Sequence, residues 1–196
     1  KGYACAVNSA GNVYCWGQQT NGKLGASTSA LSGYSYYPVP VLGTSGTGML
    51  SNIVQITTGS ETTCALSDSG KMGYNNNDSL GVHSNANFKY YIPVNYSGYP
   101  TNLIQVAQGN DSGCVLNSTG SVYCCGNYKQ GQTGTGSFGT KLWVYTQVKG
   151  GVQGGTNLTG ATNISVGYSN SCATTSSGTA YCWGSNTYGQ IGNSVT

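Results

Sequence analysis

Two cysteines ten positions apart, with a glycine between them, recur three times along this chain. The pairs are Cys5 and Cys15, Cys114 and Cys124, and Cys172 and Cys182. A fourth copy starts at Cys64 and has Tyr74 where the second cysteine would stand. If the two positions face each other across a β-hairpin, every copy leaves a three-residue loop that ends in glycine, which adopts the left-handed conformation of such loops with least strain. The spacing therefore predicts four hairpins, three of them closed by a disulfide.

Hairpin disulfides compete with two other interpretations of these cysteines. One is buried free thiols in strands, and the other is a zinc site. Zinc sites usually combine C-x2-C spacing with further Cys or His ligands, whereas the spacing here is ten and the only histidine is His83. The sequence favours disulfides and indicates neither a metal nor a cofactor. Because disulfides persist in oxidising compartments, we expect an extracellular or cell-surface protein.

Two cysteines, Cys64 and Cys125, are left over from this scheme. Cys125 stands where Trp16 and Trp183 stand in other copies. Because the two leftover cysteines belong to consecutive repeats, a disulfide between them would link neighbouring units. The alternative is two thiols, and the sequence does not separate these interpretations.

Sequons for N-glycosylation agree with an oxidising compartment, and we expect glycosylation of at least one of them where the source cell has the machinery. The candidate sites are Asn77, Asn95, Asn110, Asn117, Asn157 and Asn163.

The cysteine hairpin is one of four markers that recur in the same order. A stretch such as "NIVQITTG" or "NLIQVAQG" precedes three hairpins, a loop such as "NGKLG" or "YGQIG" follows, and an extended piece such as "YYPVPV" completes the unit. Enrichment in Val, Ile, Thr and Tyr between Gly, Asn and Ser predicts strands. Four short strands in about 50 residues are typical of a β-propeller blade.

The expected fold is therefore all-β, a β-propeller of about four blade-like repeats of 50–59 residues in a single repeat domain, 1–196. Both ends of the series are expected to be incomplete, because the first repeat lacks its leading strand and the last lacks its Pro-Val strand. The repeats are placed at about 1–52, 53–102, 103–160 and, in part, 161–196.

The stretches "CAVNSAGNVYCWG", "NGKLG", "YPVPV" and "IVQITTG" resemble the repeat of the regulator of chromosome condensation family, in its cysteine-bearing bacterial form. The resemblance covers almost the whole chain, and four ordered markers make it specific. It implies a β-propeller, which is typically seven-bladed in that family, whereas this chain holds about four units. Many members carry a His shortly before the cysteine, but Thr62, Ser112 and Asn170 stand there here, so no role of that His carries over.

Composition excludes several classes of function. Only 6% of residues are charged, against a norm of about 25%, and the net charge of +3 comes without a basic run, so nucleic acid is not an expected partner. No apolar stretch reaches the roughly 18 residues that span a bilayer. No pair of acids at a repeated spacing suggests general acid–base catalysis. We therefore expect a protein that is not an enzyme and does not span a membrane.

Tyrosine is the other prominent residue, with 16 copies. On a surface it is a favoured contact residue, since it joins an apolar ring to a hydroxyl; the alternative is packing between blades. The candidate contact residues are Tyr34, Tyr36, Tyr37, Tyr90 and Tyr91.

These observations favour a non-enzymatic extracellular structural or adhesive module, such as a subunit of a filament or of a surface structure. Incomplete ends would leave unpaired strand edges, which template pairing with another chain. We expect the partner to be a copy of the chain or another propeller-completing chain. Contacts are expected at 1–15 and 180–196 and at tyrosine-rich loops at 34–37 and 88–99.

Two other functions stay open at the level of the sequence. One is a secreted protein- or glycan-binding propeller, inhibitor-like or lectin-like, and glycans are therefore among the expected partners. The other is a nucleotide-exchange factor, which the resemblance implies through the founding member of the family. That role is nuclear, and the expected disulfides disfavour it.

Overall fold

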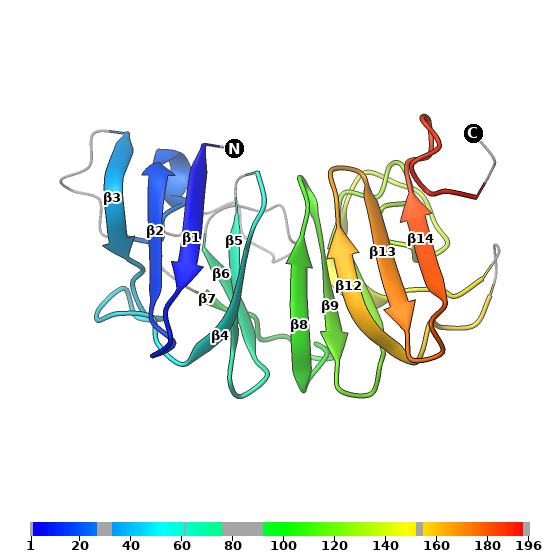
Figure 1. Ribbon diagram of the computed structural model, residues 1–196, viewed down its shortest axis with the longest axis horizontal. Coiled ribbons are helices and arrows are strands. Elements are labelled where there is room, and N and C mark those ends of the chain that lie inside the picture. Colours follow the sequence, from blue (N-terminus) through cyan, green and yellow to red (C-terminus); the bar gives the residue numbers. More distant parts are fainter. Residues whose placement is uncertain (1, 27–32, 61, 76–91, 152–154, 194–196) are drawn as a thin grey trace. The chain divides into compact units, whose positions relative to one another are not determined.

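A computed structural model describes residues 2–26, 33–60, 62–75, 92–151 and 155–193 (Figure 1). Within these ranges the chain is built from β-strands and one 3-10 turn, η1 (Thr20–Gly22). The strands form four antiparallel sheets, and the chain divides into two compact units. The first unit contains Lys1–Asp78 and His83–Gly98, and the second contains Tyr99–Thr196 with residues 79–82. Each expected repeat contributes one sheet.

The first unit holds two sheets. One has the order β1-β2-β3 and the other the order β4-β5-β6-β7. The strands are β1 (Tyr3–Val7), β2 (Val13–Gln18), β3 (Tyr34–Pro40), β4 (Ile53–Thr58), β5 (Thr63–Ser67), β6 (Met72–Asn75) and β7 (Ile92–Pro93). Strand β1 packs beside β4, so the second sheet covers one face of the first (Figure 1).

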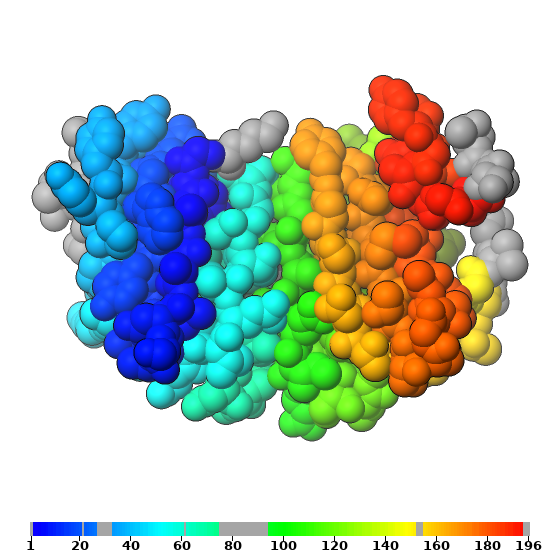
Figure 2. Space-filling model, viewed as in Figure 1, coloured from blue at the N-terminus to red at the C-terminus, as the bar shows by residue number. Residues whose placement is uncertain are grey.

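The second unit repeats this plan. Its sheets have the orders β8-β9-β10-β11 and β12-β13-β14. The strands are β8 (Leu103–Gln108), β9 (Ser112–Asn117), β10 (Val122–Gly126), β11 (Leu142–Gln147), β12 (Ala161–Val166), β13 (Asn170–Thr175) and β14 (Ala180–Gly184). Strand β12 packs directly against β8, as can be followed by their colours in Figure 2.

The four hairpins have the register that the spacing predicts. Cys5 faces Cys15, Cys64 faces Tyr74, Cys114 faces Cys124 and Cys172 faces Cys182. The last residue of each loop is a glycine with positive φ: Gly11 at 75°, Gly70 at 69°, Gly120 at 78° and Gly178 at 81°. The amide of each glycine donates to the carbonyl three residues earlier, which closes the turn. Local turn chemistry therefore sets the pairing of the cysteines.

The hydrophobic core of each unit lies between its two sheets. In the first unit it joins Val13 and Cys15 of β2 to Ile53 of β4 and Ala65 of β5. In the second unit it joins the Cys114–Cys124 hairpin to strands β12 and β13. The cysteine hairpins are therefore part of the packing between neighbouring sheets.

In each unit, a backbone hydrogen bond connects the first hairpin turn to the sheet that follows it. The Gly11 carbonyl accepts a hydrogen bond from the Ile53 amide at 3.1 Å, and the Gly120 carbonyl accepts one from the Ala161 amide at 3.0 Å. In the second unit, the Gln105 side chain bridges the inner strands β8 and β12: its Oε1 accepts from the Ile164 amide at 2.9 Å, and its Nε2 donates to the Ile164 carbonyl at 3.0 Å. The same contact between a hairpin turn and a strand thus joins the two sheets within each unit.

Candidate interaction surface

Three disulfides close the hairpins at the positions that the cysteine spacing predicts, namely Cys5–Cys15, Cys114–Cys124 and Cys172–Cys182. Their environments differ. Cys114 and Cys124 are 1% and 0% exposed, whereas Cys172 and Cys182 are half-buried. The first of these pairs lies between two sheets of its unit, and the second lies on the outer face of the last sheet.

Cys64 and Cys125 take part in none of these disulfides; both are buried thiols. The structure thus records the two-thiol state, one of the two interpretations that the sequence left open for Cys64 and Cys125. In β10 consecutive side chains alternate, so Cys125 points away from the face that carries Cys124. Its thiol makes a hydrogen bond with Tyr145, and complete burial raises its pKa to about 12. Cys125 thus behaves as a core residue that stays protonated at neutral pH.

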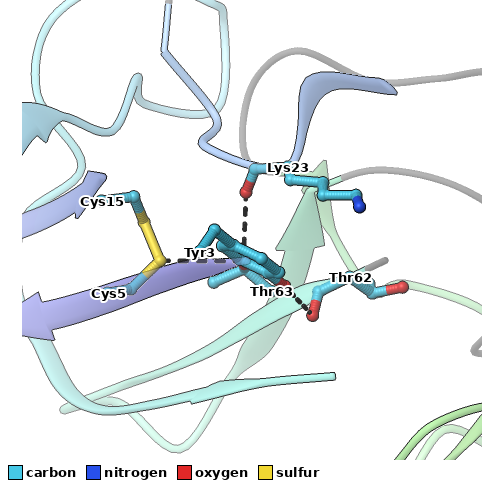
Figure 3. Close-up of a disulfide and its surroundings, with 6 residues drawn as sticks. All are labelled: Tyr3, Cys5, Cys15, Lys23, Thr62 and Thr63. Carbon is cyan, nitrogen blue, oxygen red and sulfur yellow. Dashed lines mark hydrogen bonds between the residues drawn. A yellow bond between two sulfur atoms is a disulfide. The ribbon is translucent and has the colours of Figure 1, made fainter. Parts of the chain in front are cut away.

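A polar joint surrounds the first disulfide where the two sheets of the first unit meet (Figure 3). The Thr63 hydroxyl lies 3.8 Å from the Cys5 sulfur and donates to the Lys23 carbonyl at 3.2 Å. The Tyr3 hydroxyl donates to the Thr62 carbonyl at 2.8 Å. Thr62 and Thr63 are buried, so these bonds satisfy groups that water does not reach.

The second unit repeats the joint with other side chains. The Ser171 hydroxyl lies 4.0 Å from the Cys114 sulfur and donates to the Gln132 carbonyl at 3.1 Å. The Trp183 indole N–H donates to the same carbonyl at 2.9 Å. A hydroxyl directly before the cysteine therefore ties the loop of one sheet to the next sheet in both units. This repeated hydrogen bond holds the two sheets of each unit in a defined position relative to each other.

The outer strand β3 carries the tyrosines that the sequence singles out. Pairing with β2 shifts between Cys15–Val39 and Gly17–Ser35, so residues 36–38 bulge opposite the single residue Trp16. Because a bulge breaks the alternation of a strand, Tyr36 and Tyr37 both face solvent, at 87% and 79% exposure. Tyr34 is also exposed, at 55%. The segment 34–37 thus lies in a strand, which corrects its interpretation as a loop.

The outer strand β11 of the second unit has the same bulge. Its pairing with β10 shifts between Cys124–Thr146 and Gly126–Leu142. Trp143 and Val144 are exposed there, while Tyr145 is buried against Cys125. The Lys141 ammonium lies 4.3 Å from the centroid of the Trp143 ring, a cation–π contact. A bulged outer strand that presents bulky side chains is therefore a repeated feature.

The remaining predicted positions are distributed as follows. Tyr90, Tyr91, Asn77 and His83 lie outside the described residues. Among the described sequons, Asn95, Asn157 and Asn163 are exposed and Asn110 and Asn117 are half-buried. The Asn157 and Asn163 amides are engaged, the first with Gln147 and Lys149 and the second with Gln105. The side-chain Oδ1 of Asn117 accepts three hydrogen bonds from Thr119 and Ser121 within its turn.

A hollow of about 230 Å³ opens in the second unit beside β14. Trp183 forms one wall, Phe138 and Lys149 form others, and Gly131 and Gly134 line it with backbone. Gly134 is obligatory here, because its φ is +63° and a Cβ would lie 2.8 Å from the Trp183 ring. The expected sequence motifs do not identify this hollow, since its walls come from three separate segments.

Neither metal ligation nor a membrane span is indicated by the part of the chain that the structure describes. There, no three His, Cys, Asp or Glu side chains gather as a metal site would require. No helix in that part is long and apolar enough to cross a bilayer.

Comparison with known proteins matches both units. The family model described as the regulator of chromosome condensation (RCC1) repeat matches residues 10–66. A second model with the same description matches 103–132 and 161–190. Together the two models cover more than half of the chain.

Solved structures show the same fold. Human WBSCR16 is 16% identical to this chain with a TM-score of 0.76. The match covers 94% of this chain and 45% of WBSCR16. Yeast RCC1 (Prp20), solved bound to Kap60, is 18% identical with a TM-score of 0.73, at coverages of 95% and 42%. Prp20p from Saccharomyces cerevisiae is 16% identical with a TM-score of 0.75, at coverages of 100% and 46%.

This chain therefore spans less than half the length of these structures. Its sheets correspond to blades of their β-propellers. The chain belongs to the family of proteins built from regulator of chromosome condensation repeats.

Proposed function

We propose that this chain is a non-enzymatic β-propeller module that works outside the cell or on its surface, where it binds other protein chains, copies of itself included, as a structural or adhesive unit. The observation that carries the proposal is the exposure of Tyr34, Tyr36 and Tyr37 side by side on the edge strand β3.

The tyrosine surface, defined as Tyr34, Tyr36 and Tyr37, has the chemistry of a protein contact. Tyrosine is enriched at the centres of interfaces, because its ring buries a large apolar area while its hydroxyl keeps a polar contact. The bulge opposite Trp16 directs two adjacent tyrosine side chains to solvent, so both rings are accessible to a partner. The pairing of β3 with the disulfide-closed β2 supports the same conclusion, since it holds the surface on a rigid base.

An oxidising compartment is supported by the role of the disulfides in packing. Cys15, Cys114 and Cys124 are almost fully buried between sheets, so their sulfurs are part of the core rather than accessory links. Six of the eight cysteines are paired in disulfides. Such dense use of disulfides is typical of secreted and surface proteins.

Protein binding by propellers of this fold is documented for the yeast relatives. Yeast RCC1 (Prp20) was solved bound to Kap60, and Prp20p is described with binding properties to Gsp1p and histones. The present proposal takes from them only the use of a propeller surface for protein partners.

Sedimentation velocity at micromolar concentration tests the proposal. The wild-type chain should associate, and the double variant Tyr36→Ser/Tyr37→Ser should associate at least about tenfold more weakly, because truncating a central interface residue costs upwards of about 1–2 kcal/mol. The matched control is Tyr168→Ser/Tyr188→Ser, which removes two exposed tyrosines outside any described strand.

The control should sediment like the wild type. A wild-type chain that stays monomeric at tens of micromolar would refute self-association through this surface. Equal weakening in both double variants would show that the tyrosine surface has no special role.

A further inference from the structure

The sequons for N-glycosylation are a sequence feature that the tyrosine surface does not use. Those in the described ranges are Asn95, Asn110, Asn117, Asn157 and Asn163. In each of them a glycan would be attached to the side-chain Nδ2, and it is a bulky surface group. A folded chain tolerates it best where this nitrogen is exposed to solvent and the amide makes no contact that the fold needs. The structure therefore allows these sites to be compared.

Two of the sequons hold Nδ2 itself in a short hydrogen bond. The Asn157 Nδ2 donates to the Gln147 Oε1 at 2.7 Å, and the Asn157 Oδ1 accepts from the Lys149 ammonium at 2.8 Å. The Asn110 Nδ2 donates to the Asp111 Oδ2 at 2.6 Å, and the Asn110 side chain is half-buried. A sugar on either nitrogen would therefore compete with a partner that already contacts it.

Two other sequons use the amide oxygen to hold local structure. The Asn117 Oδ1 accepts from the amide and the hydroxyl of Thr119 and from the Ser121 amide, so it shapes the turn between β9 and β10. The Asn163 Oδ1 accepts from the Gln105 Nε2 at 2.7 Å, next to the bridge between β8 and β12. These amides are fixed in one orientation, and they cannot rotate to make room for a sugar without breaking these bonds.

Asn95 differs from these four sites. Its side chain is exposed and makes no hydrogen bond with any described residue. Asn95 directly follows Val94, which is 7% exposed and donates its amide to the Met72 carbonyl at 2.9 Å. The turn after it is open, because Ser97 and Gly98 are exposed and a Cβ at Gly98 would meet no atom within 4 Å. The backbone is thus anchored beside Asn95, and there is space around the turn for a large substituent.

We propose that Asn95 is the described sequon that carries an N-linked oligosaccharide when the chain is made by a cell with the N-glycosylation machinery. In the transfer, the Asn95 Nδ2 forms a bond to the anomeric carbon of an oligosaccharide carried on a lipid pyrophosphate. The bond between that carbon and the pyrophosphate oxygen breaks, the lipid pyrophosphate leaves, and Nδ2 loses one proton. The inference rests on the proposed function in one respect, since a chain meets this donor only on the secretory route.

The effect of the fold on site use follows from these contacts. A glycan at a constrained amide opposes the hydrogen bonds that the folded chain makes there, so chains modified at these amides should be depleted from the folded, secreted product. A glycan at Asn95 opposes no such bond. Asn95 should therefore dominate among the described sites in the folded product.

Site mapping on the secreted chain tests the proposal. The full chain is secreted from a cultured animal cell line behind a cleavable signal peptide, and its folded fraction is treated with peptide N-glycosidase F in heavy-oxygen water. This enzyme converts a glycosylated Asn to a labelled Asp, so mass spectrometry identifies each occupied site. Asn95 should be labelled in the majority of chains, and each of the other four described sequons in a minority.

A matched pair of variants at one exposed position completes the test. Ser97→Ala removes the hydroxyl that the sequon requires but keeps Asn95, so the secreted chain should lose the mass of one glycan without a change in its thermal unfolding. Ser97→Thr keeps the sequon and should keep the glycan. Ser165→Ala, which removes the sequon of Asn163, should leave the glycan content unchanged.

An unlabelled Asn95 in the secreted chain would overturn the proposal. Occupancy of Asn157 or Asn163 equal to that of Asn95 would overturn it as well, because their amide contacts would then not restrict the modification. Neither outcome bears on where the chain works in its own cells, since the added signal peptide directs it to the secretory route in every case.

Discussion

Replacing Cys114 and Cys124 together by alanine should lower the free energy of unfolding of the second unit by roughly 4–5 kcal/mol. About 3 kcal/mol of this comes from the closed ring of about 11 residues, whose loss frees the unfolded chain. The rest comes from two side chains that are 1% and 0% exposed, because removing their sulfur atoms leaves a cavity between the sheets.

The Cys172→Ala/Cys182→Ala variant is the matched control, since its ring has the same length and belongs to the same unit. Both cysteines are half-buried there, so the loss should be close to the ring contribution alone. Urea unfolding followed by fluorescence measures both values. Equal losses in the two variants would contradict a packing role for the Cys114–Cys124 disulfide.

Gly120→Ala should be the most damaging single substitution in the hairpin turns, with a loss of roughly 2–5 kcal/mol. Its φ of +78° penalises any side chain by about 1–2 kcal/mol. In addition, a Cβ would lie 2.9 Å from both the Cα and the nitrogen of Gly160, so the following sheet would have to shift. Overpacking of this kind costs a further 1–3 kcal/mol or so.

Gly178→Ala separates the two effects, because Gly178 has the same turn position and a φ of +81° but no atom within 4 Å of its Cβ position. It should lose only about 1–2 kcal/mol. The difference between the two variants in urea unfolding reports the contact between the Gly120 turn and the start of β12. If Gly178→Ala were as damaging as Gly120→Ala, that contact would contribute nothing to stability.

The hairpins could be predicted from the sequence because their determinants are local. A ten-residue spacing, a glycine at the loop end and β-forming neighbours set the register of Cys5 against Cys15 without any distant contact. The division into four sheets followed from the repeat of these signals. The division of the fold into hairpins and sheets could thus be predicted from the sequence alone.

The bulge on β3 could not be predicted, because it depends on how β2 and β3 fit together rather than on either sequence alone. Strict alternation would have placed Tyr36 and Tyr37 on opposite faces. Three residues opposite Trp16 put both in solvent, which created the tyrosine surface. The sequence identified these tyrosines as candidate contact residues, but only the structure shows that they face solvent together.

The proposed Cys64–Cys125 link illustrates a different limit. Membership of consecutive repeats says nothing about the face on which a side chain lies. Cys125 is held against Tyr145 in its own unit, and this contact could not be read from spacing.

Side-chain bridges between sheets were also missed, although a signal for one was present. Gln55 and Gln105 occupy the same position in two repeats, four residues before Gly59 and Gly109. A glutamine repeated on an inner strand indicates an amide that pairs with backbone, as Gln105 does with Ile164. The hydroxyls of Thr63 and Ser171 gave no comparable signal, because Thr and Ser are frequent throughout the chain.

A thiol count on the chain as its own cells make it is the most direct test of an extracellular propeller built on disulfides. The chain is first alkylated at lysis and then denatured without reductant in the presence of a second, distinguishable alkylating reagent. The second reagent should label two thiols, Cys64 and Cys125. Before denaturation neither should react readily, since both are buried and the pKa of Cys125 is raised to about 12. Peptide mapping should place the other six cysteines in the three hairpin disulfides. Eight alkylated thiols would instead place the chain in a reducing compartment and contradict the proposed function.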